Sequence, residues 1–149
     1  MNEELSIIYN KSLDILSRRE HSTKEITQKL AKKFENKNSI QEVISKLVEN
    51  NLLNDARFAE MYTKARKRKG FGPKKIFFEL LEKGLHEKDI NIAIYNEGEW
   101  ELAAKKVFQK KFPRGKPDDI KLLLKQKSFL INRGFGFKEI ESVFGNDMV

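Results

Sequence analysis

The chain repeats itself with a period of 50 residues, and this constrains its fold more than any other feature. Three sets of apolar positions are in register: Leu30, Leu80 and Leu130; Ile40, Ile90 and Ile140; and Val43, Ala93 and Val143. Gly84 and Gly134 match by the same step, while the first copy has Phe34 there. A fixed period of this length is typical of stacked supersecondary units. Such stacks more often present long, curved binding surfaces than catalytic clefts.

Each copy of the repeat contains three apolar segments with helical spacing, and no segment has a convincing strand pattern. We therefore predict an all-α fold of three tandem three-helix repeats, each of about 50 residues, forming an elongated, curved helical array. We expect residues 1–149 to be a single domain. The repeat units are expected at approximately 1–53, 54–98 and 99–149.

Short polar residues and glycines indicate where the helices begin and end. Ser22 and Glu25 have the spacing of a capping box at the start of the second helix. Ser39 is the expected N-cap of the third helix. Either Asn54 or Asp55, and later either Asp118 or Asp119, is expected to cap a further helix. Gly84 is expected to follow the end of a helix in the left-handed conformation, and Gly134 is expected to end a later helix.

The composition excludes several classes of function. The sequence has no cysteine, which rules out disulfides and thiolate metal sites. Neither His21 nor His86 has the spacing of a metal ligand, and we expect both at surface or capping positions. We predict no enzyme activity, no cofactor and no metal. No apolar run approaches the roughly 18 residues of a membrane span, and the N-terminus is unlike a signal peptide. We therefore expect a cytoplasmic protein that makes no membrane contact.

The net charge of +8 indicates an acidic partner. The charge rises from +1 over residues 1–53 to +3 over 54–98 and +4 over 99–149. Two basic spans without any acid, 64–75 and 105–116, dominate the second and third repeats. They could neutralise nucleic-acid phosphates or meet an acidic protein groove. The candidate contact residues are Lys64, Arg66, Lys67, Arg68, Lys69, Lys74, Lys75, Lys110, Lys111, Arg114 and Lys116.

Four short segments of the chain form a recognisable series: His21-Ser22-x-x-Glu25, Leu53-Asn54-Asp55-x-Arg57-Phe58-Ala59, Gly70-x-Gly72-Pro73-x-Lys75-Ile76-x-x-Glu79-Leu80 and Phe129-Leu130-x-x-Arg133-Gly134-Phe135. In this order they resemble the RecX family, and the resemblance extends over roughly residues 12 to 145. RecX proteins are small all-helical regulators of the bacterial recombinase RecA. They lie in the groove of the RecA–DNA filament and limit its activities in recombination, DNA repair and the SOS response. The resemblance implies tandem three-helix repeats, no catalysis and no cofactor.

We therefore expect a non-catalytic, monomeric regulator whose partner is the RecA filament. Contact with single- or double-stranded DNA remains open. The alternative is a stand-alone, sequence-nonspecific DNA-binding module built from helix-turn-helix-like pairs. The candidate recognition helices lack a consistent set of Asn, Gln and Arg for base readout, which weighs against that alternative. We expect Asp55, Arg57, Phe58 and Gly134 to maintain the fold.

Overall fold

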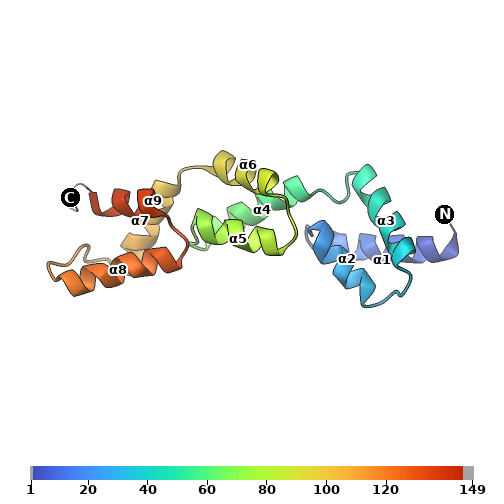
Figure 1. The fold of residues 1–149 in the computed structure, drawn as a ribbon, viewed down its shortest axis with the longest axis horizontal. Coiled ribbons are helices and arrows are strands. Elements are labelled where there is room, and N and C mark those ends of the chain that lie inside the picture. The colour runs from blue at the N-terminus through green and yellow to red at the C-terminus, as the bar shows by residue number, and fades with distance from the viewer. Residues whose placement is uncertain (1, 146–149) are drawn as a thin grey trace. The chain divides into compact units, whose positions relative to one another are not determined.

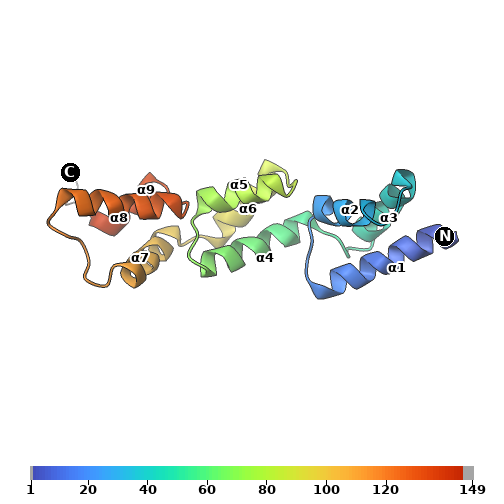
Figure 2. The ribbon, with the colours of Figure 1, turned by 90° about the horizontal axis from the view of Figure 1, so that it is seen from below.

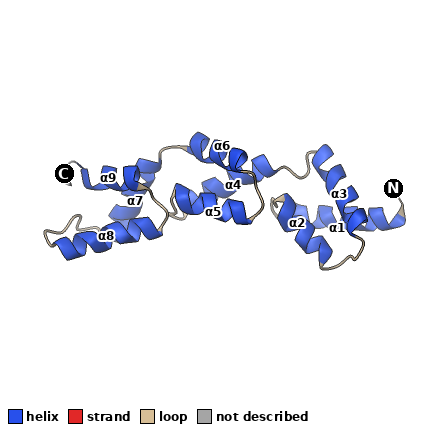
Figure 3. Cartoon of the chain, in the orientation of Figure 1, coloured by secondary structure: helices blue, strands red, loops and turns tan. Residues whose placement is uncertain are grey.

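The computed structural model describes residues 2–145, which form α-helices joined by turns and loops without any strand (Figure 3). Their nine helices are α1 (Glu3–Arg18), α2 (Thr23–Ala31), α3 (Lys37–Glu49), α4 (Asp55–Arg68), α5 (Pro73–Glu82), α6 (Glu87–Glu97), α7 (Trp100–Lys111), α8 (Ile120–Asn132) and α9 (Phe137–Phe144). The helices follow one another in three sets of three. This confirms the all-α fold class and the tandem three-helix repeats.

The 50-residue period is the spacing of core positions. Leu30, Leu80 and Leu130 lie on α2, α5 and α8, and each is 0% exposed. The isoleucines of the second set lie on α3, α6 and α9 and are also buried. Burying an aliphatic side chain stabilises the folded state by about 1.5–3 kcal/mol. The 50-residue period therefore marks equivalent buried positions on the corresponding helices of the three repeats.

The chain divides into two compact units. Unit 1 consists of Met1–Met61 and Leu80–Ile90, and unit 2 of Tyr62–Glu79 and Asn91–Val149. In unit 1, α1, α2 and α3 pack together (Figure 1) around a core of Leu5, Ile8, Ile26, Leu30, Ile40, Val43, Ile44, Leu47 and Leu53. In unit 2, α7, α8 and α9 pack together (Figure 2) around Ala103, Ala104, Phe108, Leu130, Phe135, Ile140 and Phe144. The single-domain interpretation stays a prediction.

The predicted capping box at the start of α2 is present. The Ser22 hydroxyl accepts a hydrogen bond from the backbone N–H of Glu25 at 3.1 Å. The Glu25 carboxylate accepts one from the Ser22 N–H at 3.0 Å. The Ser39 prediction is wrong, because Asn36 caps α3 and its side-chain oxygen accepts from the Ser39 N–H at 3.1 Å. An Asn side chain caps as well as Ser, so the helix begins at the earlier residue.

The structure also decides between the paired alternatives. Asn54 caps α4 by accepting from the backbone N–H of Arg57 at 3.0 Å. Asp55 is the first residue of that helix, and its carboxylate accepts from the backbone N–H of Thr23 at 2.8 Å. Asp119 caps α8. The carboxylate of Asp55 therefore fastens the start of α4 to the start of α2 within unit 1.

Unit 1 contains a junction between the start of α2 and the end of α5. The Ser22 hydroxyl donates to the carbonyl of Lys83 at 2.8 Å, and the Lys24 ammonium donates to the carbonyl of Glu82 at 3.0 Å. The Lys83 ammonium lies 3.2 Å from the Glu25 carboxylate. A Cβ at Gly84, whose φ is +87°, would lie 2.7 Å from the Cβ of Lys24. A side chain larger than hydrogen would separate the two helix ends.

Unit 2 contains the corresponding junction between the start of α5 and the end of α8. The Gly72 N–H donates to the carbonyl of Arg133 at 2.7 Å, and the Lys74 N–H donates to the carbonyl of Gly134 at 2.9 Å. Gly134 has φ +99°, and a Cβ there would overlap the Cβ of Lys75. The two glycines that the period places in register thus meet the same demand, a left-handed turn at a close approach.

Gly134→Ala should destabilise the protein by about 3 kcal/mol. A left-handed residue other than glycine costs about 1–2 kcal/mol, and overlap with Lys75 adds about 1–3 kcal/mol. Urea unfolding measures the loss. Gly115→Ala is the matched control, because Gly115 has φ +80° with nothing within 4 Å of its added Cβ. Equal losses for the two variants would show that the close approach contributes nothing.

Glu25 should carry part of the acid sensitivity. Burial raises the pKa of Glu25, but hydrogen bonds from Arg19, from the Ser22 N–H and from Lys83 outweigh it and lower the pKa to about 2. A carboxyl group with a lowered folded-state pKa stabilises fully above its ordinary value of 4.5 and loses that contribution as pH falls toward 2. Glu25→Gln should therefore flatten the dependence of the unfolding free energy on pH between these values. Urea unfolding at several pH values across this range measures the effect, with Glu35→Gln, a change at an exposed residue, as the control. The prediction is contradicted if the unfolding free energies of both variants keep the wild-type dependence on pH.

Candidate functional site

A basic groove of about 740 Å³ lies within unit 2. Residues from the end of α4, the turn after it, α7 and the end of α8 line it. The lining contains eight basic side chains and two acidic ones. The basic residues are Lys64, Lys67, Arg68, Lys69, Lys106, Lys110, Lys111 and Arg133. We call this surface the basic groove.

Helix α7 supplies both the apolar and the basic parts of one wall. Leu102, Lys106 and Lys110 are four residues apart, so they lie along one face of the helix. Ala103, Val107 and Lys111 form the neighbouring row with the same spacing. Leu102 is 47% exposed, which is high for a leucine. Lysine ammonium groups thus stand beside an accessible aliphatic surface centred on Leu102, which we call the aliphatic floor.

Helix α4 supplies the facing cations, and some of them are held by Glu97. The Lys64 ammonium lies 3.1 Å from the Glu97 carboxylate. The Lys67 ammonium donates to the carbonyl of Gly98 at 2.8 Å and lies 3.6 Å from Glu97. Burial raises the pKa of Glu97, but the hydrogen bonds and positive charges of Lys64 and Lys67 lower it overall. The single negative charge of Glu97 is therefore shared by two of the groove's cations and offsets one of their two positive charges.

Six other cations of the groove have no ion pair among residues 2–145: Arg68, Lys69, Lys106, Lys110, Lys111 and Arg133. All of them except Arg133 are exposed. Surface charges of one sign around a concave site raise the local potential and attract ions of the opposite sign. These six side chains therefore carry most of the uncompensated positive charge of the basic groove.

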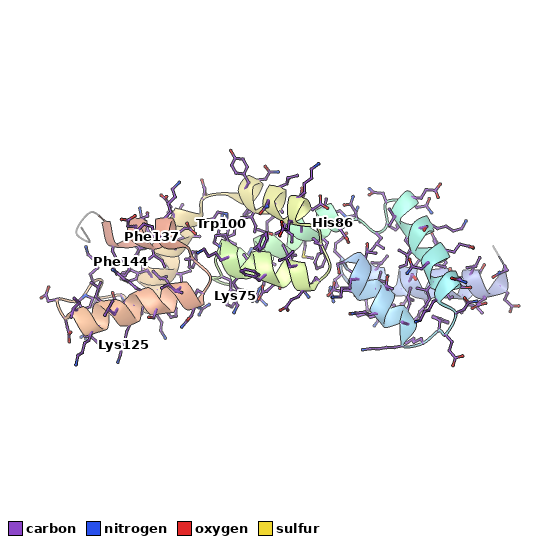
Figure 4. The ribbon with its side chains drawn as sticks, in the orientation of Figure 1. Lys75, His86, Trp100, Lys125, Phe137 and Phe144 are labelled. Carbon is purple, nitrogen blue, oxygen red and sulfur yellow. The ribbon has the colours of Figure 1, made fainter. Side chains whose placement is uncertain are left out.

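Cations cover the aromatic rings in and near the groove. The Arg133 guanidinium lies 5.2 Å from the ring centre of Phe129, and Lys111 lies 5.6 Å from it. Arg66 lies 3.9 Å from the ring centre of Phe71. Trp100, labelled at the start of α7 in Figure 4, lies under Lys67 and donates its indole N–H to a backbone carbonyl. These rings are engaged in cation–π contacts rather than offered to a ligand.

The structure brings six of the eleven predicted contact residues into the basic groove: Lys64, Lys67, Arg68, Lys69, Lys110 and Lys111. The other five lie outside its lining. Arg66 is paired inside unit 2, and Lys74 and Lys75 belong to the junction with α8. Arg114 and Lys116 lie in the segment between α7 and α8. The roles of all eleven in binding stay predictions.

Two cations of the groove, Lys106 and Arg133, are not among the predicted contact residues, and the aliphatic floor is not predicted either. Lys106 lies in the predicted basic span 105–116, and the spacing of four residues along α7 would have placed it beside Leu102 and Lys110. The sequence singles out Arg133 only as part of the segment Phe129-Leu130-x-x-Arg133-Gly134-Phe135. The approach of the end of α8 to α4, which carries Arg133 to the groove, has no local signal in the sequence.

The expectation for His21 is wrong, because its side chain is 1% exposed. Its Nδ1 lies 3.0 Å from the carbonyl oxygen of Arg19, and its Nε2 lies 2.7 Å from the Lys29 ammonium. Burial lowers the pKa of His21. The neutral ring then donates from Nδ1 and accepts from Nε2. Among residues 2–145, no group of three or more His, Cys, Asp or Glu side chains is placed to hold a metal ion.

Comparison with known proteins identifies the family. Residues 9–47, 54–94 and 99–144 match the family descriptions "RecX, first three-helix domain", "RecX, second three-helix domain" and "RecX, third three-helix domain", respectively. The chain belongs to the RecX family. This confirms the resemblance, and the three matched segments coincide with the three sets of helices.

Relatives within the RecX family share most of the chain. "Regulatory protein RecX" of Pseudomonas fluorescens (strain SBW25) is 32% identical over 148 residues, covering 98% of this chain and 96% of that protein. "Regulatory protein RecX" of Yersinia enterocolitica is 35% identical over 171 residues, covering 100% and 99%. RecX from Lactobacillus salivarius has the same fold, with a TM-score of 0.82 at 23% identity over the whole of both chains. The chain is therefore a regulatory protein of this family.

None of the helices formed by residues 2–145 combines the length and the apolar character that crossing a bilayer requires.

Arg66→Ala should lower the unfolding free energy by about 1–3 kcal/mol, because it leaves the Glu79 carboxylate without its main partner. Arg66 is 22% exposed and holds Glu79 through two hydrogen bonds of 2.9 and 2.7 Å. Arg68→Ala, two residues away and exposed, is the matched control and should change stability by less than about 0.5 kcal/mol. Thermal and urea unfolding measure both. Equal effects would contradict the structural role of Arg66.

Proposed function

We propose that this protein regulates RecA by binding in the groove of the RecA–DNA filament and limiting its activities in recombination, DNA repair and the SOS response. Membership of the RecX family supports a regulatory role. In this proposal the protein acts in the cytoplasm as a monomer and without catalysis. It works by occlusion, blocking the addition of RecA subunits or the entry of a DNA strand.

The uncompensated charge of the basic groove is the observation that carries the proposal. Five exposed cations with no ion pair among residues 2–145 line the groove beside its aliphatic floor. A nucleoprotein filament offers acidic protein surface and phosphates together. Electrostatic complementarity to such a surface raises the association rate and selects the partner. The basic groove would therefore face the filament.

The alternative of a stand-alone DNA-binding module rests on the same positive charge. It requires tight binding to DNA in the absence of RecA and a steep dependence on salt. The covered rings in and near the basic groove weigh against DNA binding at that surface, because single-stranded DNA is commonly held by bases stacked on free aromatic faces.

Lys106→Glu/Lys110→Glu should raise the concentration required for half-inhibition of RecA by about tenfold, equivalent to about 1.4 kcal/mol. The two charges lie in the basic groove on α7. The assay titrates the single-strand-DNA-dependent ATP hydrolysis of RecA and measures binding to the same DNA without RecA. Wild-type protein should inhibit well below the concentration that coats bare DNA. Circular dichroism and melting should match the wild type.

Lys121→Glu/Lys125→Glu is the matched control, since it changes the net charge equally at the same spacing on α8. Neither residue lines the basic groove; Lys125 is labelled in Figure 4. Equal loss in both variants would show that net charge matters and the groove does not. Inhibition that appears only as the DNA becomes coated would favour the DNA-binding alternative. No inhibition by the wild type would overturn the proposed function.

A further inference from the structure

The basic groove combines two kinds of surface that demand different chemistry from a ligand. Its rim carries exposed ammonium and guanidinium groups, including Arg68, Lys69, Lys106 and Lys110. Its floor on α7 contains aliphatic carbon, with Leu102 47% exposed. A ligand that satisfies both must present negative charge beside an aliphatic group. The volume of about 740 Å³ is in the range of clefts that enclose a sizeable ligand.

A strand of nucleic acid meets only the first of these demands. Its phosphates would pair with the rim, but its bases seek exposed aromatic faces. The ring of Phe129 is half-buried under Lys111 and Arg133, and its centre lies 5.5 Å from the ring centre of Phe112. Trp100 is half-buried under Lys67. The aliphatic floor gives a base no stacking partner.

A polypeptide segment meets both demands. Asp and Glu carboxylates would pair with the rim, and a Leu, Ile, Val or Met side chain would cover the exposed part of Leu102. Burial of such an anchor contributes affinity that charge alone does not supply. Peptide recognition by an apolar groove, with charged residues setting the register, is a recurring mode of binding.

We infer that the basic groove binds an acidic polypeptide segment through an aliphatic anchor at Leu102, with Lys106 and Lys110 pairing with the flanking carboxylates. The inference rests on the proposed function, because it assigns the protein component of the filament, rather than its DNA, to this groove. Leu102 is then a specificity residue, and the lysines provide attraction.

Three labelled probes test the inference against the whole 149-residue chain. The first is a short peptide in which leucines are flanked by glutamates, the second replaces each leucine with serine, and the third is an oligothymidylate of equal charge. Fluorescence anisotropy should show the leucine peptide binding about tenfold or more tightly than the serine peptide, as expected for one buried aliphatic side chain. It should also bind more tightly than the oligothymidylate.

Two point variants locate the anchor. Leu102→Asn should remove the preference for the leucine peptide while leaving the weak binding of the serine peptide unchanged. Leu124→Asn is the matched control, because Leu124 is 55% exposed on α8 and lies outside the groove lining. It should keep the full preference. Lys106→Glu/Lys110→Glu should lower the affinity for both peptides by tenfold or more.

Any one of three results would overturn the inference. They are tighter binding of the oligothymidylate than of the leucine peptide, equal binding of the two peptides, and a preference for the leucine peptide that survives Leu102→Asn. Assays of RecA ATP hydrolysis separate this result from the proposed function. Loss of inhibition in Leu102→Asn supports both, whereas normal inhibition in a variant that no longer binds the peptide overturns the inference alone. A wild type that binds the peptide but never inhibits RecA overturns the proposed function alone.

Discussion

The close approach of Gly134 to Lys75 is the contact on which the arrangement of unit 2 depends. Two backbone hydrogen bonds, from Gly72 to Arg133 and from Lys74 to Gly134, fasten the end of α8 to the start of α5. Lys75 is labelled at this position in Figure 4. The same junction holds the end of α8 beside the turn after α4, where the Arg133 guanidinium donates to the carbonyl of Lys69 and lies 5.0 Å from the ring centre of Phe71. A backbone contact that only glycine permits therefore places Arg133 in the lining of the basic groove.

The basic residues of α4 show how helix phase separates stability from binding. Arg66 faces Glu79 and is mostly buried, whereas Arg68 is two residues further along the same helix and exposed. Two residues turn a helix by more than half a circle, so neighbours in one basic run serve opposite faces. Lys67 lies between these roles, because it lines the groove while bonding to Gly98. Basic residues that are consecutive in the sequence therefore do not form a single binding site.

Predictions based on local chemistry succeeded where a single residue decides the outcome. The capping box of Ser22 and Glu25 and the left-handed Gly84 depend on a few neighbouring atoms, and the structure contains them. Ser39 failed because Asn36 caps equally well and comes first. His21 failed because its burial depends on how the start of α2 packs with the rest of unit 1, which no local pattern records. About half of the predicted contact residues line the groove. The charge of a residue does not indicate toward which side of its helix the side chain points.

The sequence by itself determined the all-α class, the three-helix repeat and the glycine positions, because periodic burial and helix ends depend on residues close in the chain. It also determined that positive charge collects in the second and third repeats. Only the tertiary structure decided which cations remain unpaired and which aliphatic side chains stand beside them. Glu79 pairs with Arg66, which is 13 residues away in the chain. Glu97 pairs with Lys64, which is more than 30 residues away. Such pairings form only when packing brings separate helices together, so they leave no periodic trace in the sequence.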